Sequence, residues 1–550
     1  MSDVLIVNGR IVDGTGNPWF YGDVVLSDGR IERIAPPGTV VRGSAATVID
    51  ADGHVVAPGF IDIQSHSIIP FLRDRRSVSK VTQGITTEIL GEGWTPAPVT
   101  GENTTAFSGV LVHRMPDESD EWEALGKTWS RFDHWLSDLE RRTVSVNFGS
   151  FLGGGTLRKI GMAERMGDPS PDELAAMTRA TAEAMEDGAF GVATALIYPP
   201  NAFSGTEELV AVMSVVARYN GVHITHIRSE GDEIFAGLDE AIEIAERSGV
   251  ITEIYHLKAA GRPNWPKMAT VIEWIDEARA RGIDIGADMY PYDGSGTGLE
   301  ACLPPWADED GKLHDNIRNP EMRTRILEEM RNPSAHWENL GARSGPENVI
   351  LAQFDKPENR RFQGMRLSEI AADLGVDWHE AALILLEREG HNIFTMFLAM
   401  SEDNLRLQFQ QPWIKFGTDA GGIDPERDAG AGLVHPRAYG SYPRILGRYV
   451  RELGWLTLEV AVRKASSAVA DRLGIRDRGL LRDGMWADVI VFDPATVSDR
   501  ATYTDPHHLS VGIRDVFVNG TAVLRDGAHT DAHPGKRVNG PGYQRHVPSS

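Results

Sequence analysis

The residues best suited to chemistry are histidines and carboxylates that follow short apolar runs. They are His66, Glu92, His226, His256 and Asp419. Imidazole and carboxylate groups are suitable ligands for Zn²⁺. Each residue alone also fits a structural role, because a histidine at a strand end can simply pack, Glu92 can be a solvated loop carboxylate, and Asp419 can cap a turn. Their shared placement favours one metal centre built from all five residues.

Such a centre needs a fold that brings distant strand ends together. From residue 58 to residue 474, strand patterns alternate with helix patterns, which indicates a parallel sheet covered by helices. The predicted strands are 59–67, 86–90, 144–152, 190–197, 223–228, 251–258, 283–292 and 413–420. Eight strands of this kind predict an α/β protein with a (β/α)₈ TIM barrel, in which the candidate ligands meet at the carboxyl face.

The two ends of the chain have a different pattern, with apolar and polar residues alternating around Asn-Gly and Asp-Gly turns. This pattern is typical of hairpins with one buried face. It predicts a small β-sandwich domain built from residues 1–57 and 475–550, with the catalytic barrel (58–474) between them. Two separate β-extensions are the alternative. The charged segment 303–347, which contains Trp and Pro, is interpreted as an insertion over the barrel mouth.

Composition excludes several classes of partner. The 550-residue chain has a formal net charge of −24 and no run rich in Lys or Arg, so neither nucleic acid nor a membrane surface is an expected partner. No apolar run reaches the roughly 18 to 20 residues of a membrane helix. Cys302 is the single cysteine, and the first residues lack an export signal. We expect a cytoplasmic protein, and leave open whether it forms a homo-oligomer.

Several motifs together carry a family resemblance over nearly the whole chain. They are APGFID, GITTEILGEG, FGVATALIYPP, THIRSEGDE, HLKAAG, DMYPY, FGTDAGG and HPRAYGSYPRIL at 435–446. The chain resembles the amidohydrolase superfamily and, within it, the N-acyl-D-amino-acid deacylase (D-aminoacylase) family. The resemblance implies a metal-dependent barrel with a small β-domain, and hydrolysis of the amide bond of N-acyl amino acids, with N-acyl-D-amino acids as the first candidates.

The resemblance also assigns roles in the metal centre. His226 and His256 match the histidines that hold the tighter metal, and Asp419 matches the catalytic aspartate, here the general base and then acid. His66 matches the second histidine of the family's His-x-His motif. Two positions depart from the family, because Gln64 replaces the first histidine and Glu92 stands nearest to the missing bridging cysteine. We therefore expect one firmly bound Zn²⁺ held by Glu92, His226 and His256, with the second site weak or empty.

By the same resemblance, Lys258, Tyr198 and Tyr290 are the candidates to bind a carboxylate of a small-molecule substrate. Arg437 either adds charge there or fixes the closing loop. Both tyrosines could instead only pack the mouth beside prolines. Burying an unpaired ammonium is costly, which favours a functional role for Lys258.

The resemblance leaves the roles of two more residues undecided. An ion pair of Arg228 with Glu230 or Asp288 is as good an interpretation as a role for Arg228 in substrate binding. Ser295 is one position away from the family's serine, so substrate preference is unsettled. Alternatives are hydrolysis of a cyclic amide or other C–N bond, with the difference expected in residues 293–306, or a non-catalytic homologue that has lost its metals.

Overall fold

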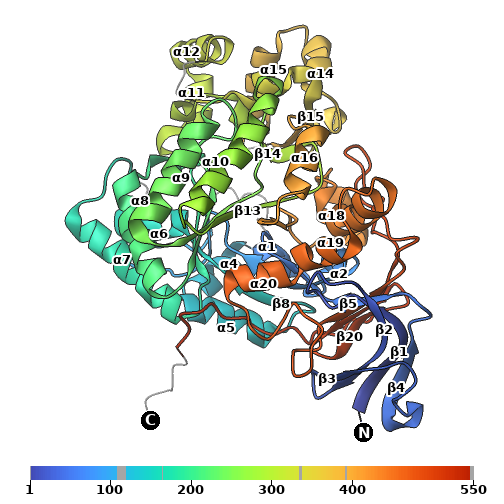
Figure 1. The fold of residues 1–550 in the computed structure, drawn as a ribbon. Coiled ribbons are helices and arrows are strands. Elements are labelled where there is room, and N and C mark those ends of the chain that lie inside the picture. The colour runs from blue at the N-terminus through green and yellow to red at the C-terminus, as the bar shows by residue number, and fades with distance from the viewer. Residues whose placement is uncertain (1, 108–118, 164, 334–336, 391–392, 545–550) are drawn as a thin grey trace.

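The computed structural model describes residues 2–107, 119–163, 165–333, 337–390 and 393–544. Its centre is a ring of short parallel strands surrounded by helices (Figure 1). The ring strands are β6 (Phe60–Asp62), β7 (Ile85–Leu90), β8 (Asn147–Ser150), β9 (Leu152–Gly153), β10 (Gly191–Ala195), β11 (Val222–His226), β12 (Ile251–Ile254), β13 (Ile285–Met289) and β17 (Ile414–Phe416).

The ring consists of two parallel sheets, β6-β7-β8 and β17-β13-β12-β11-β10-β9. On one side they join because β8 and β9 are consecutive pieces of the segment predicted as a single strand. On the other side a bridge between Ser65 and Ala420 joins the ends of β6 and β17. The predicted (β/α)₈ barrel is therefore confirmed. The bridge also fixes the distance between His66 and Asp419, which neighbour the two bridged residues.

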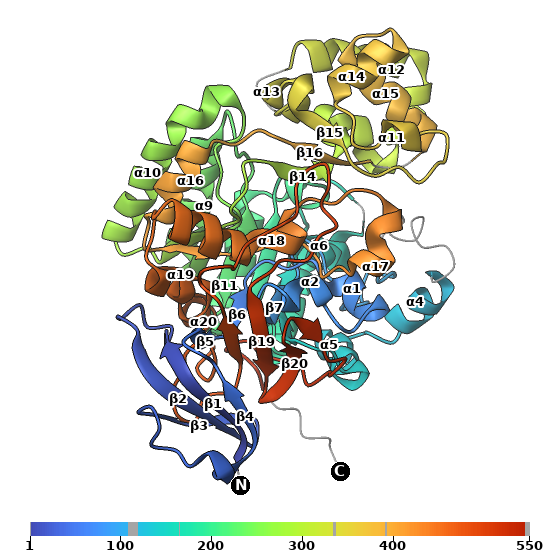
Figure 2. The same cartoon turned by 90° about the vertical axis from the view of Figure 1, so that its right-hand side faces the viewer.

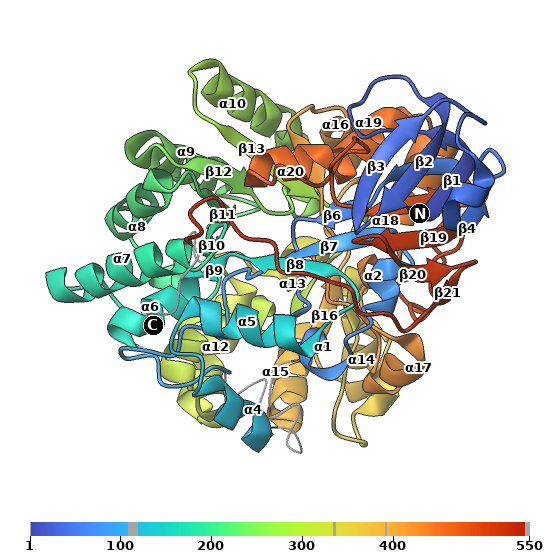
Figure 3. The ribbon, with the colours of Figure 1, turned by 90° about the horizontal axis from the view of Figure 1, so that it is seen from below.

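Helices cover the outside of the ring, as the view from below shows (Figure 3). They include α7 (Pro171–Glu186), α8 (Thr206–Arg218), α9 (Ile234–Ser248), α10 (Met268–Ala280) and α20 (Ser467–Leu473). A capping box starts α7, since Ser170 and Glu173 exchange hydrogen bonds and Pro171 is the first helical residue. Apolar side chains of these helices pack onto the strands, as Leu238 and Ile242 of α9 do.

Strands from both ends of the chain form one sheet of nine strands, with the order β21-β20-β19-β18-β5-β1-β2-β3 and β4 paired with β1. They are β1 (Ser2–Ile11), β2 (Phe20–Ser27), β3 (Arg30–Ala35), β4 (Ala45–Asp50), β5 (Val55–Pro58), β18 (Val489–Phe492), β19 (Ile513–Val518), β20 (Thr521–Arg525) and β21 (Ala528–His529). The two ends meet where β5 pairs antiparallel with β18.

The last described residues depart from the predicted domain boundary. The prediction places residues 475–550 in the small domain, yet the segment after 534 runs along the base of the barrel. Gly535 N–H donates to Val144, Val538 N–H to Phe148 and Gly540 N–H to Gly188. These backbone groups need partners when buried, and the barrel base supplies them.

The insertion is larger than predicted. It extends from β14 (Ser295–Gly298) to β16 (Phe394–Phe397), and these strands pair with β15 (Val349–Leu351) in a separate sheet. Helices including α14 (Leu367–Leu374) and α15 (Trp378–Glu389) complete a hydrophobic core of its own. Figure 2 shows this unit above the carboxyl side of the barrel. The predicted range 303–347 missed its second half, because only the pairing of β14 with β16 defines it.

Among the described residues, none of the helices combines the length and the apolar composition that a membrane span requires.

Candidate metal centre and active site

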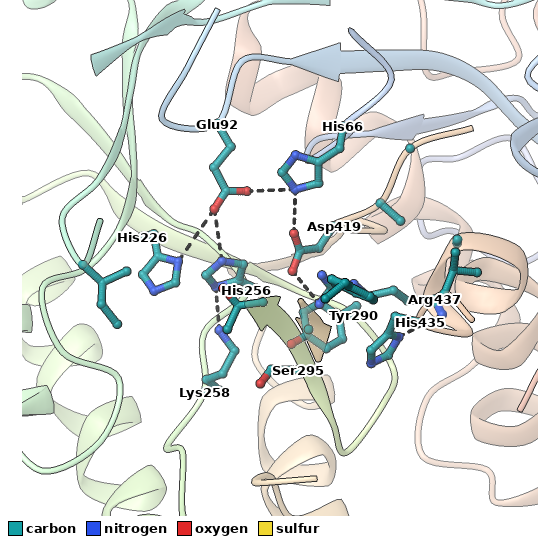
Figure 4. Close-up of a pocket in the computed structure, with 18 of the residues that line it drawn as sticks. His66, Glu92, His226, His256, Lys258, Tyr290, Ser295, Asp419, His435 and Arg437 are labelled. Carbon is teal, nitrogen blue, oxygen red and sulfur yellow. Dashed lines mark hydrogen bonds and ion pairs between the residues drawn. The ribbon is translucent and has the colours of Figure 1, made fainter. Parts of the chain in front are cut away.

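The five predicted ligands meet in one pocket at the carboxyl ends of the barrel strands (Figure 4). His226 ends β11, while His66, Glu92, His256 and Asp419 follow β6, β7, β12 and β17. The same pocket is lined by predicted substrate residues, namely Tyr198, Lys258, Tyr290, Ser295 and Arg437. Its outer wall includes Glu338, Leu340, Gln353 and Phe394, all from the insertion.

Glu92 is the centre of the cluster, because its two oxygens face different groups. Oε1 lies 3.3 Å from His256 Nε2 and 3.7 Å from His226 Nδ1. Oε2 lies 3.4 Å from His66 Nε2, which in turn is 2.8 Å from Asp419 Oδ1. The ligand atoms within each group lie within 4.8 Å of one another. Both donor sets fit a divalent metal ion by chemistry and spacing, with Glu92 shared between them.

Two of these residues have a backbone conformation, with a positive φ, that residues other than glycine rarely adopt. His256 has a φ of 33° and Asp419 a φ of 51°. Such residues cost about 1–3 kcal/mol each and persist where the surroundings fix them. The fixing contacts are clear here, since His256 N–H donates to Asp288 Oδ1 at 2.8 Å and Asp419 N–H donates to the Gln64 carbonyl at 2.9 Å.

The carboxylates and imidazoles of the cluster shift one another's pKa values. Burial raises the pKa of Glu92, but hydrogen bonds from His226, His256 and His66 outweigh it and hold that pKa well below the ordinary value. Desolvation lowers the pKa of His66, yet hydrogen bonds to Asp419 and Glu92 raise it to about 10. Desolvation also lowers the pKa of His226, and Glu230 and Glu92 raise it to about 9. The metal-free site therefore carries protonated imidazoles among ionised carboxylates.

Gln64 lies beside the cluster of candidate ligands, although it does not line the pocket. It is fully buried, and its Nε2 donates to Glu92 Oε2 at 2.5 Å. That oxygen belongs to the group formed by His66, Glu92 and Asp419. The amide thus engages a ligand atom of the second group, whereas the other Glu92 oxygen, Oε1, faces His226 and His256.

Arg437 forms an ion pair with the candidate general base, Asp419. Arg437 Nη1 lies 2.7 Å from Asp419 Oδ2, and the guanidinium stacks over Tyr290 with its carbon 4.7 Å from the ring centre. Burial raises the pKa of Asp419, but the charge of Arg437 and the hydrogen bond to His66 outweigh it and keep that pKa below its ordinary value. Asp419 is therefore ionised and able to accept a proton.

The remaining predicted substrate residues each contact different groups. Lys258 is buried, with Nζ 2.6 Å from Glu230 Oε1 and 2.7 Å from His256 Nδ1. The hydroxyl of Tyr198 hydrogen-bonds Thr297, and Ser295 lies in β14 at the pocket wall.

The alternative in which Arg228 pairs with Glu230 or Asp288 is wrong. Arg228 forms an ion pair with Glu240 at 2.8 Å and donates to the carbonyls of Ala202 and Ser204. Arg228 is not among the residues that line the pocket. The following helix explains this, because α9 starts only at Ile234 and brings Glu240 over the strand end.

Two residues at the site were missed by sequence reasoning. Glu230 contacts His226, His256 and Lys258, and its only sequence signal is its place four residues after His226 in THIRSEG. His435 is buried, with Nε2 2.9 Å from the Gly294 carbonyl, and its Nδ1 accepts the backbone N–H of Arg437 at 3.1 Å. It thereby orients Arg437 from within the HPRAYG motif.

Comparison with known proteins agrees with this geometry. Residues 369–524 match the model of the Amidohydrolase family. An N-acyl-D-glutamate deacylase of Alcaligenes xylosoxydans xylosoxydans is 35% identical over 525 residues, which cover 95% of this chain and 93% of the relative.

Two solved structures are also similar. An N-acyl-D-glutamate deacylase from Bordetella bronchiseptica, in complex with zinc and a phosphonate mimic of the tetrahedral intermediate, has a TM-score of 0.80 and 31% identity over 98% of this chain and 99% of that one. A D-aminoacylase with a binuclear metal centre has a TM-score of 0.79 and 29% identity over 98% and 100%.

The barrel and its cluster of ligands define a metal-dependent hydrolase of amide C–N bonds. More narrowly, the chain belongs to the N-acyl-D-amino-acid deacylase family of the amidohydrolases. The predicted family and enzyme class are thereby confirmed, and the non-catalytic alternative is wrong. The relatives contain zinc and other metals, so the predicted dependence on a metal is also supported.

Proposed function

We propose that this enzyme hydrolyses N-acyl-D-amino acids to a carboxylic acid and a free D-amino acid, with Zn²⁺ as the metal. The observation that carries the proposal is the convergence of the Glu92, His226 and His256 ligand group on the same pocket as the ion pair of Asp419 with Arg437. The first supplies a metal site, and the second supplies a base beside a cation.

One firmly bound Zn²⁺ is held by Glu92, His226 and His256. When bound, Zn²⁺ polarises a carbonyl and lowers the pKa of a water molecule to about 7. The second group, formed by His66, Glu92 and Asp419, is weak or empty, because Gln64 engages Glu92 Oε2 and adds no imidazole. A neutral amide is a poor Zn²⁺ ligand beside imidazole.

Asp419 is the general base and then the general acid. Its ionised carboxylate takes a proton from the attacking water as the water oxygen bonds to the acyl carbon. It returns that proton to the nitrogen as the C–N bond breaks. The ion pair with Arg437 and the contact with His66 keep the carboxylate ionised and aimed into the pocket.

Arg437, Lys258, Tyr198 and Tyr290 bind the substrate carboxylate. The strongest support comes from Arg437, whose buried Nε has no hydrogen-bond acceptor among the described residues, while its Nη1 pairs with Asp419. Buried N–H groups without acceptors are costly, so an arriving carboxylate gains from pairing with them. Ser295 stays a predicted contact at the wall. Apolar residues complete the lining, namely Ile197, Leu340, Phe394, Ile423 and Val434.

A substrate panel tests this function. We expect hydrolysis of an N-acetyl-D-amino acid with an apolar side chain, and at least about tenfold slower hydrolysis of the same compound as a carboxamide, which lacks the charge that Arg437 binds. The L-enantiomer tests the stereochemistry. Faster hydrolysis of cyclic imides than of every N-acyl-D-amino acid would replace this proposal by the cyclic-amide alternative.

The metal content of the purified protein tests whether Zn²⁺ is the cofactor. We expect about one Zn²⁺ per chain by elemental analysis, and loss of activity with a chelator that added Zn²⁺ restores. A protein purified without any divalent ion, with no rescue by Zn²⁺, contradicts the proposed metal. The cytoplasmic location and self-association stay predictions.

A further inference from the structure

Glu230 lies behind the first ligand group, on the side away from Glu92. Its Oε1 is 3.0 Å from His256 Nδ1, and its Oε2 is 3.3 Å from His226 Nε2. The opposite ring nitrogens, His256 Nε2 and His226 Nδ1, are the ones that face Glu92. One carboxylate therefore contacts the remote nitrogen of both histidines in the group.

We propose that Glu230 is a positioning residue for the metal centre, which orients both imidazoles at once and makes them better ligands. This inference rests on the proposed metal site. A histidine that gives one nitrogen to a metal carries its hydrogen on the other, and a carboxylate that accepts this hydrogen fixes the ring and strengthens the ligand. Glu230 lies within ion-pair distance of both nitrogens, with Oε1 beside His256 and Oε2 beside His226.

Lys258 competes with Glu230 for one of these nitrogens. Its Nζ lies 2.7 Å from His256 Nδ1, while Glu230 Oε1 lies 3.0 Å from the same atom. An ammonium only donates hydrogen bonds, so it cannot pair with a nitrogen that carries a hydrogen. With Nε2 committed to a metal ion, Nδ1 carries the hydrogen and pairs with Glu230. Lys258 then keeps its 2.6 Å contact with Glu230 and retains donors for a substrate carboxylate.

The loop that carries Glu230 is fixed from two directions. The Glu230 carbonyl accepts the N–H of Ala260 at 2.7 Å, which joins it to the segment after Lys258. From the insertion, the partly buried carboxylate of Glu338 accepts the Ser229 hydroxyl and the Asp232 N–H, the latter at 2.7 Å. Hydrogen bonds from two other segments thus hold the loop that carries Glu230 in place.

The affinity of the metal-free protein for Zn²⁺, measured by chelator competition, tests the inference. We expect Glu230→Gln to weaken Zn²⁺ binding about 10- to 100-fold, since the amide offers one acceptor instead of two. Glu240→Gln is the matched control, because Glu240 is also a partly buried carboxylate in an ion pair, but its partner is Arg228 outside the pocket. Its affinity should equal that of the wild type.

Two further readouts and a second variant keep the outcomes distinct. Thermal unfolding in excess chelator shows whether Glu230→Gln still folds. If it does not, Glu230→Asp keeps the charge but cannot reach both rings, and should also bind Zn²⁺ more weakly. The absorption spectrum of the Co²⁺-loaded protein should change in either variant, as the ring geometry changes.

Affinity within about twofold of the wild type in a folded variant overturns the inference and leaves the proposed function intact. A wild-type protein that binds no Zn²⁺ instead defeats the proposed metal site itself.

Discussion

Gln64 Nε2 donates a hydrogen bond to Glu92 Oε2 at 2.5 Å, so a side-chain amide engages the one oxygen of Glu92 that faces His66. Changing Gln64→His should restore an imidazole at this position. We expect the Zn²⁺ content to rise from about one toward two per chain, because imidazole is a stronger ligand than an amide. Elemental analysis after dialysis measures this. Gln64→Ala is the control and should stay near one, and an unchanged content in the histidine variant argues against a latent second site.

Asp419→Asn should abolish most of the hydrolysis. The amide cannot take the proton of the attacking water, and general-base catalysis contributes about 10²- to 10⁴-fold. The turnover rate should fall by that factor, while the firmly bound Zn²⁺ stays, since Asp419 is not part of the group of Glu92, His226 and His256. Turnover and metal content measured on the same sample separate the two effects. Full activity in this variant contradicts the assigned base.

Zn²⁺ binding should strengthen as pH rises. Glu230 and Glu92 raise the pKa of His226 to about 9, against the opposing effect of desolvation, so this imidazole is protonated at neutral pH in the metal-free protein. A metal ligand must be deprotonated, and binding therefore releases a proton. Below pH 9 the affinity should increase about tenfold per pH unit for each proton released. Chelator competition between pH 6 and pH 8 measures the slope, and a flat profile would be inconsistent with a protonated His226.

Lys80 is a buried cation beneath the site, and its removal should destabilise the fold. Its Nζ lies 2.6 Å from Asp62 Oδ2, 2.7 Å from Thr418 Oγ1 and 2.6 Å from the Ala420 carbonyl. It therefore ties the end of β6 to the end of β17. Lys80→Ala leaves Asp62 buried without its cation and should cost about 3–5 kcal/mol in the free energy of unfolding.

Denaturant unfolding of the Lys80 variant measures this cost. The matched control is Lys127→Ala, because Lys127 is exposed and its loss should change the free energy of unfolding by less than about 0.5 kcal/mol. A cost below 1 kcal/mol for Lys80→Ala would mean that the buried contacts of Lys80 do not hold the two strand ends together.

The sequence by itself determined the barrel, the family and the set of candidate ligands. Strand and helix patterns are local, and in a parallel barrel every strand delivers its last residues to the same face. For that reason His66, Glu92, His226, His256 and Asp419 could be placed in one pocket before any contact was seen. The departures at Gln64 and Glu92 were also visible in the sequence.

Tertiary structure alone decided which side chains meet. Arg228 pairs with Glu240 rather than with Glu230, because the start of α9 sets which carboxylate lies over the strand end. Glu230 reaches two histidines on different strands, a contact that depends on the spacing of β11 and β12 in the closed ring. The insertion extends to Phe397 because β16 pairs with β14, about 100 residues away in the chain. These contacts join residues whose separation in sequence says nothing about their distance in space.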